Sequence, residues 1–296
     1  VGDEAGTALT TGDNNVAVGF AALKTEDANS GNTAIGYQSL EDLNAGADSY
    51  NTALGYISGT DITTGVRNTI IGAFSGDDLT DADHNVTLGF GALGSDVKGN
   101  KSIAIGVDAL TSQNFTTSTD TYNVAVGYNA GVAITTGLRN NLFGAFAGDS
   151  LTDADDNVAV GDSALNADTL GSKSVAIGRG TLATQNFTTA TDSHNVAAGY
   201  FAGNAITTGI QNTLIGGLAG DALTTGEVNV AVGISALGAE TKGHHSVAIG
   251  NSALAAQNNT TSTSVYNTAV GSLAGNAVTT GTSNTLIGGL AGTALT

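Results

Sequence analysis

Four residue types are missing from this chain: its 296 residues include no cysteine, proline, methionine or tryptophan. Without cysteine the chain can form no disulfide, thiolate metal site or cysteine nucleophile. Positive charge is scarce, because 8 basic residues stand against 26 acidic ones and the formal net charge is −18 at pH 7. We therefore expect no nucleic-acid partner and no attraction to an anionic membrane surface. No apolar run approaches the ~18 residues of a membrane helix, so no membrane insertion is expected.

Glycine, in contrast, is abundant, and its 43 copies are not spaced every third residue, which excludes collagen. Many of these glycines close a five-residue motif. Asn-Val-Ala-Val-Gly stands at Asn15–Gly19, Asn123–Gly127 and Asn157–Gly161, and variants of it recur throughout the chain. The closing residues, called marker glycines below, are Gly19, Gly36, Gly55, Gly72, Gly89, Gly106, Gly127, Gly144, Gly161, Gly178, Gly199, Gly216, Gly233, Gly250, Gly271 and Gly288.

The spacing of the marker glycines predicts a solenoid. It is 17 for most neighbouring pairs, such as Gly72 and Gly89, and it widens to 21 in every fourth place, so the pattern repeats after 72. A fixed period of about 20 residues is typical of stacked coils. We predict an all-β fold, a parallel β-solenoid of about 17 coils that runs as one continuous domain over residues 1–296. Because the first residue is Val1 and both ends interrupt the pattern, we expect a segment of a longer chain.

Four coil types alternate, counted here from Gly55 (first), Gly72 (second), Gly89 (third) and Gly106 (fourth), and positions are numbered from the marker glycine. Position −1 is apolar in all 16 full copies, and position −3 is Val, Ile or Thr in all but one. Side chains at −1 and −3 share one face of a strand, so we predict that this face is the core of the coil. Position −4 is Asn in 13 copies, which favours a ladder of amide side chains along the solenoid. A second short strand is expected around position +3.

Position −2 should then point outward, yet no copy carries a charge there. A strand that is apolar on both faces is buried on both faces, and a coil this short has only one interior. The simplest cover is another copy of the chain, and a homotrimer would let three copies share one seam. The candidate seam residues, from positions −2 and +2 of the second-type coils, are Ile70, Phe74, Leu142, Phe146, Leu214, Leu218, Leu286 and Leu290.

Three copies of the motif, Ser102–Gly106, Ser174–Gly178 and Ser246–Gly250, resemble the S-V-A-I-G repeat of trimeric autotransporter adhesin heads. Those heads are left-handed parallel β-rolls wound as homotrimers. The variant at Asn32–Tyr37, Asn-Thr-Ala-Ile-Gly-Tyr, also resembles repeats of bacteriophage tail-fibre proteins. The adhesin coil is shorter than the coil predicted for this chain, and stalk heptads and a membrane anchor are missing here. A chain that is only a segment would explain the second difference, and the regular 72-residue array of longer coils favours a phage fibre over an adhesin.

Few residues are candidates for chemistry. Phe115 and Phe187, in the long connections of fourth-type coils, could contact a receptor or glycan, although we favour the interpretation that each ring folds back over its own coil. Acidic connections such as 77–83 and 149–156 could gather calcium, but they match no calcium-loop pattern and are interpreted as solvated turns. The four histidines and the remaining polar residues form no catalytic motif. We predict no enzyme activity, no metal site and no cofactor.

The sequence thus favours a structural shaft segment of a homotrimeric fibre, most simply a bacteriophage tail fibre on the virion surface that serves host attachment. The alternative is the head of a trimeric adhesin on a bacterial cell surface that binds a host receptor or glycan. A more remote alternative is an ice-binding solenoid, which the spacing of the Thr pairs disfavours, because they recur only in every fourth coil.

Overall fold

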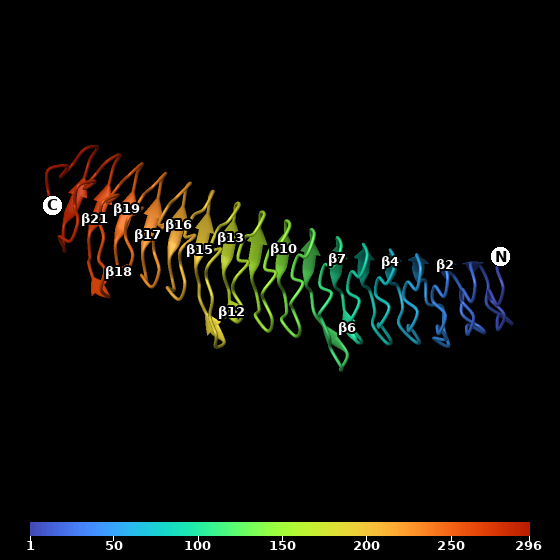
Figure 1. Ribbon diagram of the computed structural model, residues 1–296. Helices are drawn as coiled ribbons and strands as arrows, with labels where there is room; N and C mark the ends of the chain where they lie inside the picture. The colour runs from blue at the N-terminus through green and yellow to red at the C-terminus, as the bar shows by residue number, and fades with distance from the viewer. The chain divides into compact units, whose positions relative to one another are not determined.

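The computed structural model describes all residues 1–296 as an all-β parallel β-solenoid of about 16 turns with no helix. Its residues group into two compact units, Val1–Ala145 and Phe146–Thr296, which are described separately. Within each unit, one short strand per coil stacks beside the strand of the next coil (Figure 1). The predicted fold class is confirmed, with one coil fewer than expected, because the partial copy at Val1-Gly2 forms no strand.

The first unit contains eight main strands joined in one parallel ladder, and each successive pair is in register. They are β1 (Val16–Val18), β2 (Thr33–Ile35), β3 (Thr52–Leu54), β4 (Thr69–Ile71), β5 (Val86–Leu88), β7 (Ile103–Ile105), β9 (Val124–Val126) and β10 (Asn141–Phe143). A small side sheet pairs β6 (Gly99–Asn100) with β8 (Thr119–Asp120), and β6 lies at the edge of the stack opposite the main strands (Figure 1).

The second unit repeats this plan with eight more main strands. They are β11 (Val158–Val160), β13 (Val175–Ile177), β15 (Val196–Ala198), β16 (Thr213–Ile215), β17 (Val230–Val232), β19 (Val247–Ile249), β21 (Thr268–Val270) and β22 (Thr285–Ile287). Its two side sheets pair β12 (Gly171–Ser172) with β14 (Thr191–Asp192), and β18 (Gly243–His244) with β20 (Thr263–Ser264).

Stacking explains why every motif ends in glycine. Gly89 has φ +143°, and a Cβ built on it would lie 2.3 Å from the carbonyl oxygen of Gly106 in the next coil. Such a contact is far inside van der Waals distance, and the φ value is one that L side chains rarely adopt. Only glycine allows successive coils to approach at strand spacing where each strand bends away.

The interior of the coil is the reverse of the predicted one. Position −2, expected to face outward, points inward and is fully buried in residues such as Ala53 and Ala104. Positions −1 and −3, expected to form the core, are exposed or half-buried in every coil, and Leu54 at −1 is 44% exposed. A coil this short is so narrow that two strand faces cannot both contribute large side chains to it. Where position −2 is the small Ala104 or Ala159, it leaves room for a leucine from the turn of the same coil, Leu110 or Leu165.

The segment around position +3 is a turn, so the expected second strand is absent there. Positions +2 and +4 adopt left-handed backbone in each coil, for example at Phe74 (φ 55°) and Leu93 (φ 54°). This conformation costs roughly 1–2 kcal/mol for a non-glycine residue. Complete burial of the Leu93 side chain contributes about 2–3 kcal/mol in return. Second strands occur instead in the side sheets. They begin at position +10 of the third-type coils, in β6, β12 and β18, and pair with β8, β14 and β20 in the fourth-type coils.

Candidate functional site

The outer face of the main strands exposes an apolar side chain in every coil of each unit. It is formed by the side chains at positions −1 and −3, none of which is buried and none of which is charged. Position −1 is apolar in all 16 coils, including Ile35 in the first unit and Ile177 in the second. Because large exposed apolar patches are uncommon on monomeric soluble proteins, this face is a candidate interaction surface.

The predicted seam residues divide between the two sides of the strand. Ile70, Leu142 and Leu214 lie fully inside their own coils, and Leu286 is half-buried near the end of the chain. Their inward direction follows from the reversal of position −2, so they cannot line an outer seam. The four candidates at position +2 are exposed, and they are Phe74, Phe146, Leu218 and Leu290.

The two receptor-contact candidates are buried. Phe115 is 7% exposed and Phe187 is 6% exposed, so neither ring is presented to a partner. Each is held in place by its backbone nitrogen, which donates to the carboxylate of Asp96 or Asp168 over 3.0 Å. The ring of Phe187 also packs on Gly171, whose Cβ would lie 2.7 Å from it. The interpretation that these rings cover their own coils is the one the geometry agrees with.

A buried amide ladder runs through each unit, as the Asn at position −4 predicted. Asn68 is fully buried; its Nδ2 donates to the carbonyl oxygen of Ala82 over 2.7 Å, and its Oδ1 accepts from the backbone nitrogen of Asn85 over 2.9 Å. One side chain therefore closes its own coil and bonds to the next. Where Ser102 replaces Asn, the amide of Gln113 donates to the Ser102 hydroxyl over 2.9 Å, so that an amide side chain is still present at this point of the ladder.

Sequence reasoning missed four buried carboxyl groups at position +7 of the third-type coils. They are Glu26, Asp96, Asp168 and Glu240. Asp96 accepts hydrogen bonds from the backbone nitrogens of Gly99 and Phe115 and from Nε2 of Gln113. Burial raises the pKa of Asp96, although the hydrogen bonds from Phe115 and Gln113 act in the opposite direction. The sequence did contain a signal for these buried acids. In three of the four cases the same position of the next coil is a Gln that donates to the carboxylate, and these residues are Gln113, Gln185 and Gln257.

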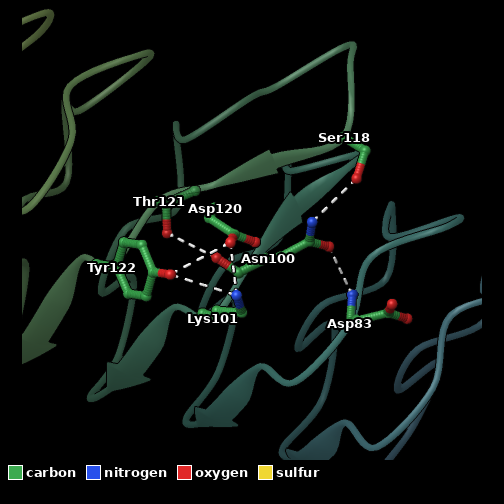
Figure 2. Close-up of polar contacts among 7 residues, drawn as sticks. All are labelled: Asp83, Asn100, Lys101, Ser118, Asp120, Thr121 and Tyr122. Atoms are coloured by element: carbon green, nitrogen blue, oxygen red, sulfur yellow. Dashed lines mark hydrogen bonds and ion pairs between the residues drawn. The ribbon is translucent and has the colours of Figure 1, made fainter.

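The side sheet of the first unit carries a polar cluster, shown in Figure 2. Lys101 Nζ lies 2.5 Å from Asp120 Oδ2, and Tyr122 Oη donates to the same carboxylate over 3.2 Å. Hydrogen bonding to Asp120 raises the pKa of Lys101, and the pKa of Asp120 is lowered in turn. Asn100 bridges neighbouring segments, because its Nδ2 donates to Ser118 Oγ and its Oδ1 accepts from Asp83 N. These contacts fasten the long connection to its neighbours.

The acidic connections are hydrogen-bonded turns. Asp81 accepts from Thr64 Oγ1 over 2.6 Å, and Asp83 accepts from Val66 N over 2.8 Å. No group of three or more His, Cys, Asp or Glu side chains is arranged to hold a metal ion. No helix long and apolar enough to cross a membrane is present either.

Five exposed aromatic side chains form a row along the first unit, which we call the aromatic row: Phe20, Tyr37, Tyr56, Phe74 and Phe90. Successive ring centroids are 5.1–5.6 Å apart, and the first three rings are stacked. A hollow of about 300 Å³ opens at the Phe90 end of the row and is lined by Phe74, Phe90 and a set of aspartates and hydroxyls. In this hollow, burial raises the pKa of Asp77 to about 6, with further increases from the charges of Asp78 and Asp61.

No protein-family model, curated protein or solved structure matches this chain. The class of protein that the fold defines is a parallel β-solenoid repeat protein with short coils, one main strand to each.

Proposed function

We propose that this chain is a structural shaft segment of a homotrimeric fibre, and that the fibre is a bacteriophage tail fibre at the virion surface that serves host attachment. The observation that carries the proposal is the outer strand face, which is apolar at position −1 in all 16 coils and free of charge at position −3. In a sheet with one face on the core and the other in solvent, the solvent face usually carries polar residues. Folding of the coil alone would therefore not require apolar residues on the outer strand face. An apolar residue at position −1 of every coil is explained by a partner that covers this face in each unit.

A second copy of the chain is the simplest cover, because a partner with the same coil spacing matches the repeat without slipping out of register. Closed rotational symmetry leaves no apolar face open to further association. Three copies arranged around one axis would each direct one strand face inward, which the repeats resembling adhesin heads and tail fibres also favour. The mechanism is mechanical: stacked backbone hydrogen bonds and buried amide ladders make each coil stiff, and the shared seam adds stability.

The oligomeric state is tested by light scattering coupled to size exclusion, together with sedimentation velocity. The expected mass is about three times the 29.0-kDa mass of the chain. A folded monomer that persists at low and high protein concentration would refute the fibre proposal.

The biological setting is tested by immunogold labelling with antibodies raised against this chain. Labelling of thin projections on purified phage particles is expected. Labelling of the bacterial outer surface, with none on particles, would instead support a cell-surface adhesin whose partner is a host receptor or glycan.

A further inference from the structure

The aromatic row occupies the position directly after the marker glycine, +1, in four of its five coils, and Phe74 at +2 continues it where +1 is Ala73. Its members are exposed: Tyr56 is 48% exposed and Phe90 is 53% exposed. Such rings bury large apolar area when a partner covers them. The row therefore needs an explanation separate from the fold of the coil.

The +1 position is distinct from the proposed seam at −1 and −3. Corresponding positions point in the same direction in each coil of a regular solenoid. In the second unit the +1 position carries Asp162 and Arg179, which form an ion pair at 3.3 Å with both side chains more than half exposed, and also Asn251 and Ser272. Positions −1 and −3 carry no charge in either unit. The +1 position thus carries charge where positions −1 and −3 carry none. The row of five neighbouring rings is confined to the coils of Gly19 to Gly89, although the single Tyr200 also stands at +1 in the second unit.

The hollow beside the row owes its space to two glycines. Gly91 and Gly94 stand at positions +2 and +5 of a third-type coil, where the two third-type coils of the second unit carry Ser163 with Asn166 and Ser235 with Gly238. A Cβ at Gly94 would lie 3.2 Å from the carbonyl oxygen of Gly91 and 3.3 Å from Asp77 Oδ1, so any side chain there would enter the hollow.

The lining of the hollow combines two kinds of group. Phe74 and Phe90 supply apolar ring surface, with centroids 5.6 Å apart at 72°. Asp77, Asp78 and Asp108 supply carboxylate oxygens, and Ser95 and Thr111 supply hydroxyls. Carboxylates and hydroxyls accept hydrogen bonds in several directions. None of the lining residues is basic, and the chain carries a net charge of −18, so an anionic ligand would be repelled.

From this combination we infer that the hollow between Phe74 and Phe90 binds an uncharged saccharide. A pyranose ring has an apolar face of C–H groups that packs on an aromatic ring, and a rim of hydroxyls that donate to carboxylates. The hollow offers both on neighbouring coils, and the aromatic row extends it toward Phe20 for further sugar units. The inference does not rest on the fibre proposal, because an isolated first unit would carry the same residues.

The test uses the full chain and two neutral probes, maltohexaose and N-acetylated chitohexaose, measured by saturation-transfer NMR and by calorimetric titration. Because the site is open and shallow, we expect a dissociation constant on the order of 1 mM for at least one probe. Phe90→Ala should weaken binding at least fivefold, and Gly94→Asn, which introduces the residue found at Asn166, should do the same by filling the hollow. The matched control is Ile234→Ala, which truncates the +1 residue of the third-type coil at Gly233 in the second unit and should leave affinity unchanged.

Circular dichroism and light scattering accompany each variant. Loss of binding in both Phe90→Ala and Gly94→Asn, with unchanged fold and oligomer mass, supports the site. Three results would overturn it: neither probe binds at 10 mM, the two variants bind as well as the control, or Phe90→Ala lowers the oligomer mass and so places the row in a subunit seam. A monomeric chain that still binds the probe would refute the trimer and leave the saccharide site standing.

Discussion

Asn68 and Asn85 occupy the same position in consecutive coils, and the Oδ1 atom of the first accepts the backbone N–H of the second over 2.9 Å. The same bond recurs between Asn212 and Asn229 in the second unit, at 3.1 Å. Because the amide nitrogen of Asn68 also binds Ala82 in its own coil, each residue of the ladder joins the closure of one coil to the stacking of the next.

Replacing Asn68 with Ala should therefore destabilise the protein. The change leaves the Ala82 carbonyl and the Asn85 N–H without their partners inside the coil, and each such group costs about 1–3 kcal/mol. We expect a loss of about 2–4 kcal/mol in the free energy of unfolding, measured by denaturant titration. Asn44→Ala, at an exposed position, is the control and should change the unfolding free energy by less than about 0.5 kcal/mol. Equal losses in the two variants would contradict the role of the ladder.

The marker glycines give a second prediction. Gly89→Ala should strongly destabilise the stack, because its Cβ would lie 2.3 Å from Gly106 O in backbone with φ +143°. We expect a loss above about 3 kcal/mol, or failure to fold. Gly46→Ala is matched in that Gly46 also has positive φ (+69°), yet a Cβ there meets nothing within 4 Å. That variant should lose only about 1–2 kcal/mol, the cost of left-handed backbone. Thermal melts of the two variants that coincide would count against the stacking explanation.

Acid should stabilise the folded chain. The pKa of Asp77 is raised from 3.8 to about 6, first by burial, and burial also raises the pKa values of Asp61, Asp149 and Asp221. Between pH 4 and 6 the folded state retains protons that the unfolded state releases. The free energy of unfolding should consequently fall as pH rises through this window and be largest near pH 4.

The variant Asp77→Asn measures how much of this pH dependence of the unfolding free energy comes from the Asp77 carboxyl group. Because Asp77 is half exposed, screening by solvent limits its contribution to the order of 1 kcal/mol. Denaturant titrations at pH 4.5 and pH 7 should differ less for the variant than for the native chain. An unchanged difference between the two pH values would show that Asp77 is not the group that titrates.

The outer strand face gives the prediction for assembly. Ile177→Asp combined with Ile215→Asp places two charges at position −1, where the native side chains are 44% and 43% exposed. Since these side chains do not fill the coil interior, the coil should still fold, but a buried seam could not accommodate unpaired charges. We expect the mass measured by light scattering to fall to that of one chain.

The control for this experiment is Ser272→Asp, at the exposed +1 position, which adds negative charge outside the proposed seam. It should leave the mass unchanged. A double variant that keeps the native mass would exclude the −1 side chains from the interface.

The sequence alone determined the solenoid, because one short fixed period with a glycine at each bend admits no other regular stacking of short strands. It also determined the amide ladder, since Asn residues at the same position of successive coils, such as Asn68 and Asn85, lie next to one another once the coils stack. Only the tertiary structure decided which strand face is inside. Ala53 and Leu54 are both apolar and alternate along one strand, so their pattern is compatible with either direction. The choice followed from volume. A leucine from the turn, such as Leu110, fills the interior where position −2 is Ala104, and the larger Ile70 fits at −2 where position +4 is Gly76. The sequence favoured a Phe115 ring that folds back over its own coil, but its carboxylate partner Asp96 was hidden, because those residues lie 19 apart and meet only once the connections have folded.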